Sequence, residues 1–166
     1  MELSLKGKSV LVTGGNRGIG LAIALAFADE GANVAICGRD KLALAAAKSE
    51  IEARKVKAHA IAANLFTAEG CERAISETTD AFGGLNVLVS NASTNIGGTL
   101  ETLSDDQAIE RVMGKTLAAM RLSRAALPHL RNAGGGRIIC IGGTAARTPG
   151  KTSLPSGLGN SSLVNF

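Results

Sequence analysis

The sequence contains neither tyrosine nor tryptophan, and only four of its 166 residues are phenylalanines. Without tyrosine, no phenolic group can serve as an acid or a nucleophile, so any mechanism that needs one is excluded. The core must therefore come from aliphatic residues, which are available because 45% of the chain is hydrophobic. A domain near this size buries about 70% of the surface that its unfolded chain exposes. Residues 1–166 are expected to form a single domain.

Other scarce features exclude further classes of protein. The longest strongly apolar run, residues 19–28, is too short to span a bilayer, and the polar N-terminus is no signal peptide, so a cytoplasmic protein with no membrane partner is expected. The three cysteines lack CxxC spacing, and two lie in apolar runs, which favours core positions over a metal site. The mild net charge of +4, with no basic patch interleaved with aromatics, argues against binding to nucleic acid.

Short apolar runs alternate with helical patterns along the whole chain. Asp40, Thr67 and Ser104 are expected to cap helices, and Pro128 is expected to bend the end of the last long one. Apolar and polar residues do not alternate within the expected strands, and helices separate the strands. This predicts a parallel sheet covered on both faces, a doubly wound α/β domain of strand order 3-2-1-4-5. The expected strands are residues 9–12, 33–37, 56–62, 85–90 and 137–141, and the expected helices are residues 19–30, 40–55, 67–82 and 104–131.

A glycine-rich turn, TGGNRGIG at residues 13–20, joins the first strand to the first helix. Glycines permit a tight turn and a close approach of the backbone to a pyrophosphate, and the helix N-terminus behind them favours negative charge. In this position between a strand and a helix, the turn predicts a dinucleotide site rather than a simple loop.

With the spacing TGxxxGxG, the sequence resembles the short-chain dehydrogenase/reductase family. Residues 90–93, SNAS, match an element that the family reads as NNAG, and residues 124–129 and 136–139 look like the family's fourth helix end and fifth strand. The resemblance implies a Rossmann fold, a nicotinamide dinucleotide cofactor, and alcohols, ketones or related compounds as substrates. It also implies a homo-oligomer, because members often pair through the long fourth helix and the one after it.

The residues after the second strand indicate which dinucleotide is preferred. An acidic residue at the end of that strand would hydrogen-bond the ribose hydroxyls and repel a 2′-phosphate. This chain has Gly38 and Arg39 there, with Asp40 one step later as a helix cap, and Arg17 lies in the glycine loop. Two arginines aimed at a phosphate predict NADP(H) over NAD(H), although both could be solvated surface residues. With the family's adenine-side and NNAG positions, the expected cofactor-binding residues are Gly14, Asn16, Arg17, Gly18, Ile19, Gly20, Arg39, Asn64, Leu65, Asn91 and Ala92.

The family's catalytic residues are a tyrosine, a lysine four residues later, a serine and a helix asparagine. Their positions fall on Ser156, Asn160, Gly143 and Lys115 in this sequence, so all four have changed. We therefore expect an NADP(H)-binding protein of this family without ordinary dehydrogenase activity.

Two other interpretations stay open. Lys115, with its pKa lowered by partial burial, could act as an acid oriented by Ser156, which would make the protein an oxidoreductase of a carbonyl or alcohol with non-standard catalytic residues. A decayed structural copy would bind neither cofactor nor substrate. Because the family pattern continues beyond Phe166, the sheet is expected to be truncated after the fifth strand and the start of the next helix.

Overall fold

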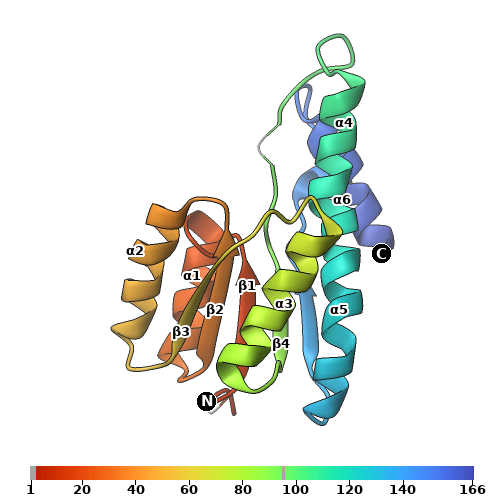
Figure 1. The fold of residues 1–166 in the computed structure, drawn as a ribbon. Coiled ribbons are helices and arrows are strands. Elements are labelled where there is room, and N and C mark those ends of the chain that lie inside the picture. Colours follow the sequence, from red (N-terminus) through yellow and green to blue (C-terminus); the bar gives the residue numbers. More distant parts are fainter. Residues whose placement is uncertain (1–2, 95) are drawn as a thin grey trace.

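Five parallel strands form the centre of the structure, a computed structural model that describes residues 3–94 and 96–166 (Figure 1). Their order is β3-β2-β1-β4-β5, as predicted. Successive strands are added on one side of β1 up to β3 and on its other side from β4 onward, so the strand order reverses between β1 and β4. In doubly wound sheets such a reversal opens a crevice at the carboxyl ends of the strands. The strands are β1 (Ser9–Thr13), β2 (Asn33–Gly38), β3 (Ala58–Ala62), β4 (Val87–Ser90) and β5 (Arg137–Cys140).

Helices cover both faces of this sheet, and the sheet divides the core into two clusters, one on each face. Leu11 of β1 belongs to the cluster under α3 and α5, whereas its neighbours Val10 and Val12 belong to the cluster under α1 and α2. This alternation follows from the period of two in a strand. The helices are α1 (Gly18–Asp29), α2 (Lys41–Glu52), α3 (Ala68–Phe82), α4 (Asp105–Val112), α5 (Ala118–Asn132) and α6 (Leu154–Asn165), with short segments η1 (Met113–Leu117) and η2 (Thr144–Ala146).

The three predicted helix caps are confirmed. The Asp40 carboxylate accepts hydrogen bonds from two amides of α2, and the Thr67 hydroxyl accepts one from the Gly70 amide at 3.0 Å. Ser104 and Gln107 form a reciprocal capping box at the start of α4. Each of these side chains satisfies amides that have no partner within the helix.

The predicted long helix over residues 104–131 is confirmed as a continuous helical run, Asp105–Asn132, with an irregular turn in its middle. A π-helical turn, η1, separates α4 from α5 at the point where Gly114 contacts the Phe66 ring. A Cβ atom on Gly114 would lie 2.5 Å from Phe66 Cε1, so the ring packs directly on the helix backbone. Pro128 lies within α5, and the irregular turn comes earlier in the chain.

The third and fourth strands begin two residues later than predicted. Asparagine side chains contribute to the pairing there: Asn86 Oδ1 accepts a hydrogen bond from the Ser9 amide, and Asn33 Oδ1 accepts one from the Lys57 amide. These contacts add to the backbone hydrogen bonds from the Asn86 amide to the Ser9 carbonyl and from the Val34 amide to the Lys57 carbonyl.

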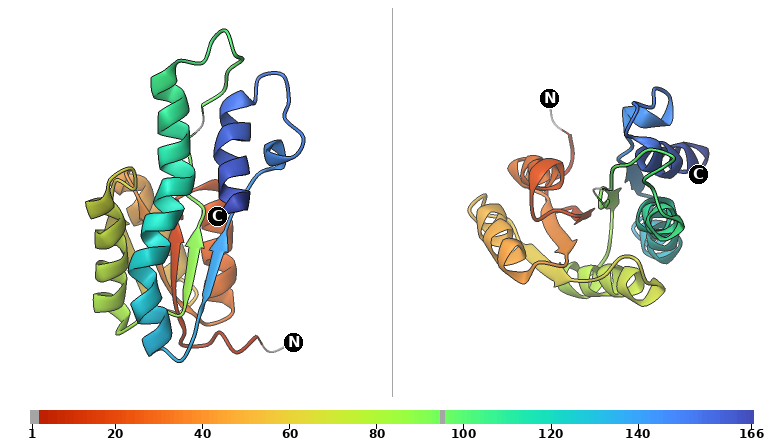
Figure 2. Two further views of the ribbon diagram at one scale, coloured as in Figure 1. Left: turned by 90° about the vertical axis from the view of Figure 1, so that its right-hand side faces the viewer. Right: turned by 90° about the horizontal axis from the view of Figure 1, so that it is seen from above.

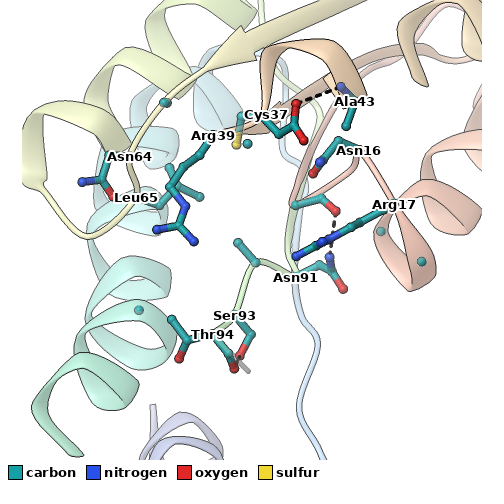
Figure 3. Close-up of a pocket in the computed structure, with 18 of the residues that line it drawn as sticks. Asn16, Arg17, Cys37, Arg39, Ala43, Asn64, Leu65, Asn91, Ser93 and Thr94 are labelled. Carbon is teal, nitrogen blue, oxygen red and sulfur yellow. Dashed lines mark hydrogen bonds between the residues drawn. The ribbon is translucent and has the colours of Figure 1, made fainter. Parts of the chain in front are cut away.

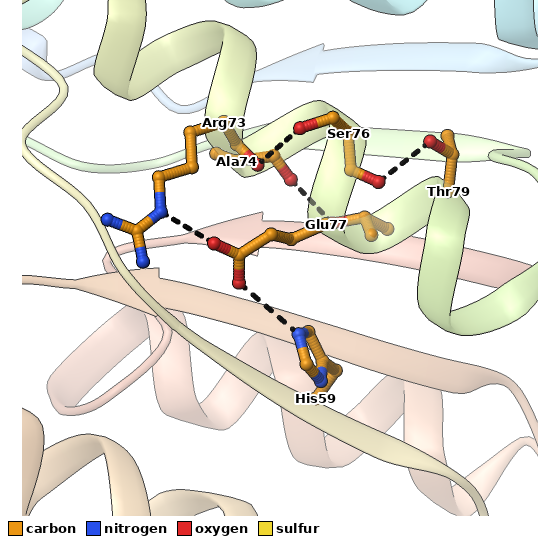
Figure 4. A network of polar contacts seen from close by, with 7 residues as sticks. His59, Arg73, Ala74, Ser76, Glu77 and Thr79 are labelled. Carbon is orange, nitrogen blue, oxygen red and sulfur yellow. Dashed lines mark hydrogen bonds and ion pairs between the residues drawn. The ribbon is translucent and has the colours of Figure 1, made fainter.

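A polar network joins β3 to α3 on the surface (Figure 4). His59 Nε2 lies 3.5 Å from Glu77 Oε2, and Arg73 Nε lies 2.5 Å from Glu77 Oε1. The hydrogen bond from Arg73 is the main cause that lowers the pKa of Glu77. Because these side chains are partly exposed, the network contributes little to stability.

The last helix, α6, packs beside α4 and lies above the carboxyl end of β5 (Figure 2). Within β5, at the edge of the sheet, Ile138 and Ile139 are 36% and 40% exposed, whereas Leu88 on the neighbouring strand is fully buried. In the part of the chain that the structure describes, no helix is both long enough and apolar enough to cross a bilayer.

Candidate functional site

A groove of about 650 Å³ opens at the carboxyl ends of the strands (Figure 3). The loop after β1, the ends of β2, β3 and β4, and the π-helical turn η1 form its walls. The structure brings all of the residues that the sequence predicts for cofactor binding to this one groove: Gly14, Asn16, Arg17, Gly18, Ile19, Gly20, Arg39, Asn64, Leu65, Asn91 and Ala92.

The glycine loop has a shape that side chains would prevent. Gly14 and Gly18 have φ angles of +65° and +55°, in the left-handed region where glycine is favoured. A Cβ atom on Gly20 would lie only 2.2 Å from the Gly14 carbonyl oxygen. The loop therefore lies tightly against the start of α1, whose N-cap residue Arg17 makes no capping side-chain hydrogen bond. The first amides of α1 face the groove with the polarity that suits an anion.

Thr13 and Asn91 hold β1 and β4 together on either side of the crevice. The Thr13 hydroxyl accepts hydrogen bonds from the amides of Asn91 and Ala92 at 2.9 and 3.0 Å. In return, Asn91 Nδ2 donates to the Thr13 carbonyl at 2.9 Å. Asn91 is thus a structural part of the groove floor as well as a lining residue.

The end of β2 presents the cation of Arg39 to the groove, and the neighbouring carboxylate of Asp40 caps α2. Arg39 is exposed, and its Cζ atom lies 5.8 Å from the centre of the Phe66 ring, within the range of a cation–π contact. Asp40 Oδ1 accepts hydrogen bonds from the Leu42 and Ala43 amides at 3.0 and 3.1 Å. The carboxylate at this end of the groove is therefore used to cap α2.

The loop after β3 supplies the opposite wall. Asn64 Oδ1 accepts a hydrogen bond from the Phe66 amide at 3.2 Å, and Leu65 is buried. Behind this wall, burial raises the pKa of Cys37 to about 12 and that of Cys71 to about 11. Both thiols are neutral core groups, and for Cys37 this is what its apolar strand run predicts. Cys140, the other cysteine in an apolar strand run, is only half-buried. No cluster of three metal-binding side chains occurs among the described residues.

Lys115 is buried beneath the other end of the groove, with only 6% of its surface exposed. Its Nζ atom donates a hydrogen bond to the Ile141 carbonyl at 2.5 Å. Burial lowers the pKa of Lys115, and the nearby Arg111 charge lowers it further. The direction of this shift agrees with the sequence-based expectation.

Gly143 and Asn160, two of the four positions at which the sequence analysis expects changed catalytic residues, lie against each other. A Cβ atom on Gly143 would lie 2.9 Å from Asn160 Nδ2, and Asn160 is 4% exposed. The asparagine amide thus fills space that a side chain on residue 143 would need. These two replacements are matched to one another.

Ser156 pairs with Arg111, a residue that the sequence analysis did not identify. Arg111 Nη2 donates to Ser156 Oγ at 3.3 Å, and Nη1 donates to Ser93 Oγ at 2.6 Å and to the Thr94 carbonyl. Lys115 and Ser156 thus have different hydrogen-bond partners, and the expected orientation of Lys115 by Ser156 is not seen in residues 3–94 and 96–166.

An arginine on an amphipathic helix ordinarily indicates a surface position, which is why the sequence did not single out Arg111. Its place four residues before Lys115, on the same face of the helix, is the signal that was available.

Comparisons with known proteins agree on one family. The family model described as short chain dehydrogenase matches residues 8–155. An uncharacterized oxidoreductase of Mycobacterium tuberculosis is 33% identical over 98% of this chain and 62% of its own length. The ketoacyl reductase HetN of a Nostoc species is 34% identical over 87% of this chain and 50% of its own length. The chain thus spans between half and two thirds of these relatives.

A solved structure gives the same picture. L-Sorbose reductase from Gluconobacter frateurii, complexed with NADPH and L-sorbose, superposes with a TM-score of 0.96 at 30% identity. The match covers 100% of this chain and 64% of the reductase.

Proposed function

Because this chain belongs to the short-chain dehydrogenase family, we propose that it binds NADP(H) in the groove and lacks the family's ordinary dehydrogenase activity. The observation that carries the proposal is a contrast between two sets of residues. The residues expected to bind a nucleotide all line one groove, whereas the positions expected for the family's catalytic residues hold Lys115, Gly143, Ser156 and Asn160 and are not among the lining residues.

The preference for NADP(H) follows from the charges at the end of β2. Arg39 and Arg17 both line the groove, and both are exposed and available to a phosphate. Asp40 Oδ1 accepts both capping hydrogen bonds of α2, so this carboxylate serves the helix, one residue beyond the position where an acid would meet the ribose. A guanidinium forms strong, charge-assisted hydrogen bonds to phosphate. In the proposed complex, Gly14, Asn16 and the first amides of α1 hold the pyrophosphate, and Asn64 and Leu65 lie beside the adenine.

The proposed absence of ordinary activity rests on the lack of a suitable proton donor. Bound NADPH would supply a hydride, but reduction of a carbonyl also needs a proton. The sequence has no tyrosine to give it. Ser156 has Arg111, which cannot act as a base, as its hydrogen-bond partner, and Lys115 is held by the Ile141 carbonyl.

A second candidate function is an oxidoreductase that reduces a carbonyl or oxidises an alcohol with non-standard residues. It is favoured by the buried Lys115, since burial lowers the pKa of its ammonium group and makes it a better acid. Measurable NADPH oxidation with carbonyl substrates that disappears in Lys115→Ala would establish this function in place of the first.

The test of nucleotide binding is thermal unfolding with NADPH, with NADH and without ligand. A ligand at 100 times its dissociation constant stabilises the folded state by about 2.7 kcal/mol. We expect the shift to be larger with NADPH, and Arg39→Asp should remove that difference. Arg124→Asp changes an exposed arginine on α5 away from the groove and should leave it intact. No shift with either nucleotide would support a purely structural role.

A homo-oligomeric, cytoplasmic protein is part of the same proposal. The family resemblance supports pairing through the long helices, where Ile109 and Leu127 are 58% and 39% exposed. Sedimentation of the purified protein at several concentrations tests the assembly.

A further inference from the structure

Two buried cations lie one helical turn apart, at the junction of α4 and η1. Arg111 is 7% exposed and Lys115 is 6% exposed. The ion pairs in the described part of the chain involve Lys48, Arg54, His59 and Arg73, so neither buried cation is paired with a described carboxylate. An arginine cannot lose its proton inside a protein, and a buried charge without a counter-ion is costly. The arrangement therefore lacks a negative charge.

Several hydrogen-bonding groups at this place are also unused. Arg111 Nε and Thr94 Oγ1 are buried without a partner among residues 3–94 and 96–166. The Lys115 ammonium has three donors, and its described bond, to the Ile141 carbonyl, uses one of them. Buried polar groups are normally satisfied, so this cluster has the character of a site that binds a ligand.

The cluster lies directly behind one wall of the groove. Ser93, Thr94 and Gly114 line the groove, and Figure 3 shows Ser93 and Thr94 together on the wall, apart from Arg39 and Asn64. Arg111 donates to the Ser93 hydroxyl and to the Thr94 carbonyl from behind, and Ser93 Oγ itself donates to the Thr94 carbonyl at 3.3 Å. The Thr94 hydroxyl has no partner among the described residues. The wall thus presents one unused hydroxyl and a second that is held by a long hydrogen bond, with two buried positive charges nearby.

We propose that this wall binds the carboxylate of a small carbonyl compound. The proposal rests on the proposed function, because it places the compound in the part of the groove that the dinucleotide leaves free. The Thr94 hydroxyl would donate to one carboxylate oxygen, the Ser93 hydroxyl would turn from the Thr94 carbonyl to the other, and Arg111 and Lys115 would balance the charge. A carboxylate can accept several hydrogen bonds at once, which matches the number of donors at the wall. A neutral compound of the same shape would leave both charges uncompensated.

The test compares acetoacetate with its neutral methyl ester. Both are titrated into the protein saturated with NADP⁺, which cannot reduce the ketone, and dissociation constants are measured from the amide NMR signals of residues lining the groove. We expect acetoacetate to bind at least about tenfold more tightly than the ester at low salt. Arg111→Gln should reduce the ratio to below about twofold, whereas Arg124→Gln, a matched change on the exposed part of α5, should leave it unchanged.

Arg111→Gln also removes packing, so Thr94→Val provides a second measurement. It deletes an unpaired hydroxyl while keeping the size of the side chain, and it should weaken acetoacetate but not the ester. Equal affinity of the wild type for the two compounds would overturn the carboxylate site. So would a ratio of acetoacetate to ester affinity that stays at the wild-type value in both Thr94→Val and a folded Arg111→Gln.

The titration repeated without nucleotide, together with the thermal shift measured with NADPH, separates the two proposals. Retained NADPH stabilisation with no preference for acetoacetate contradicts the carboxylate site alone. Lost NADPH stabilisation with the preference intact contradicts the proposed nucleotide function alone.

Discussion

The groove and the neighbouring end of the sheet, near β5 and α6, are built in different ways. In the groove near β1 and α1, the backbone itself forms the site, and the Gly14 carbonyl leaves no room for a side chain on residue 20. At the other end, near β5 and α6, side chains contact one another in pairs: Asn160 lies against Gly143, and Arg111 donates a hydrogen bond to Ser156. A backbone-built site tolerates few substitutions, whereas a site built from side chains can be remodelled while the fold stays the same.

The largest predicted effect is at the backbone-built end. Gly20→Ala places a Cβ atom 2.2 Å from the Gly14 carbonyl, so the loop must move. Overpacking of this kind costs about 3 kcal/mol or more, and we expect NADPH stabilisation to disappear. Urea unfolding and thermal shift measure the two effects. Gly84→Ala is the matched control, because a Cβ atom there meets nothing within 4 Å. Unchanged NADPH binding in Gly20→Ala would refute the comparison.

A smaller effect is expected from Gly143→Ser at the other end. The new side chain would crowd Asn160 Nδ2, and we expect a loss of about 1–2 kcal/mol. Asn160→Ala should cost stability alone but relieve the crowding in the double variant. A double-mutant cycle should then show a favourable coupling of about 1 kcal/mol. Additive effects would show that the two positions are not matched.

The Asp40 cap offers a third test, which concerns nucleotide choice. Asp40→Ala should destabilise the protein by about 1 kcal/mol, because two amides of α2 lose their acceptor. Asp40→Asn should cost less, since asparagine caps nearly as well. Neither change should increase the ratio of NADPH to NADH affinity more than about twofold if the carboxylate acts only as a cap. A larger increase would indicate that Asp40 contacts the ribose.

The smallest effect is the pH dependence contributed by Lys115. Because its pKa is lowered in the folded state, folded protein releases this proton first, and stability rises with pH between the lowered value and the ordinary lysine pKa of about 10.4. Lys115→Met lacks this contribution. The raised pKa values of Cys37 and Cys71 act in the opposite direction, but equally in both proteins. The Lys115 charge lowers the pKa of Cys140, so its removal raises that pKa further and adds to the difference in the same direction. The stability difference, wild type minus variant, should therefore grow with pH; a constant difference would contradict a lowered pKa.

The sequence predicted the backbone-built end in detail. Strand order, helix caps and the position of the glycine loop depend on local chemistry and periodicity, which neighbouring residues reveal. Asp40 and Ser104 are examples, because each caps a helix only two or three residues away.

The other end depended on contacts that the sequence does not display. Arg111 is buried because Gly159 and Ser156, more than forty residues later, leave room for it. The π-helical turn was missed for the same reason: Phe66 packs on Gly114 from a distant part of the chain. The family resemblance predicted the four changed catalytic positions, but not the contacts that these residues make.

The π-helical turn at Met113–Leu117 also absorbs a difference in chain length. A π-turn holds about one more residue than the equivalent α-helical turn. In a regular α-helix an extra residue rotates everything after it by about 100°, whereas the wider turn lets α4 and α5 keep their relative orientation. Deleting a single residue within the turn would therefore restore a continuous α-helix and leave Arg111 in its place behind the groove wall. A one-residue change in length is thus accommodated at this turn, whereas in a regular stretch of the same helix it would turn part of the ligand-facing surface away.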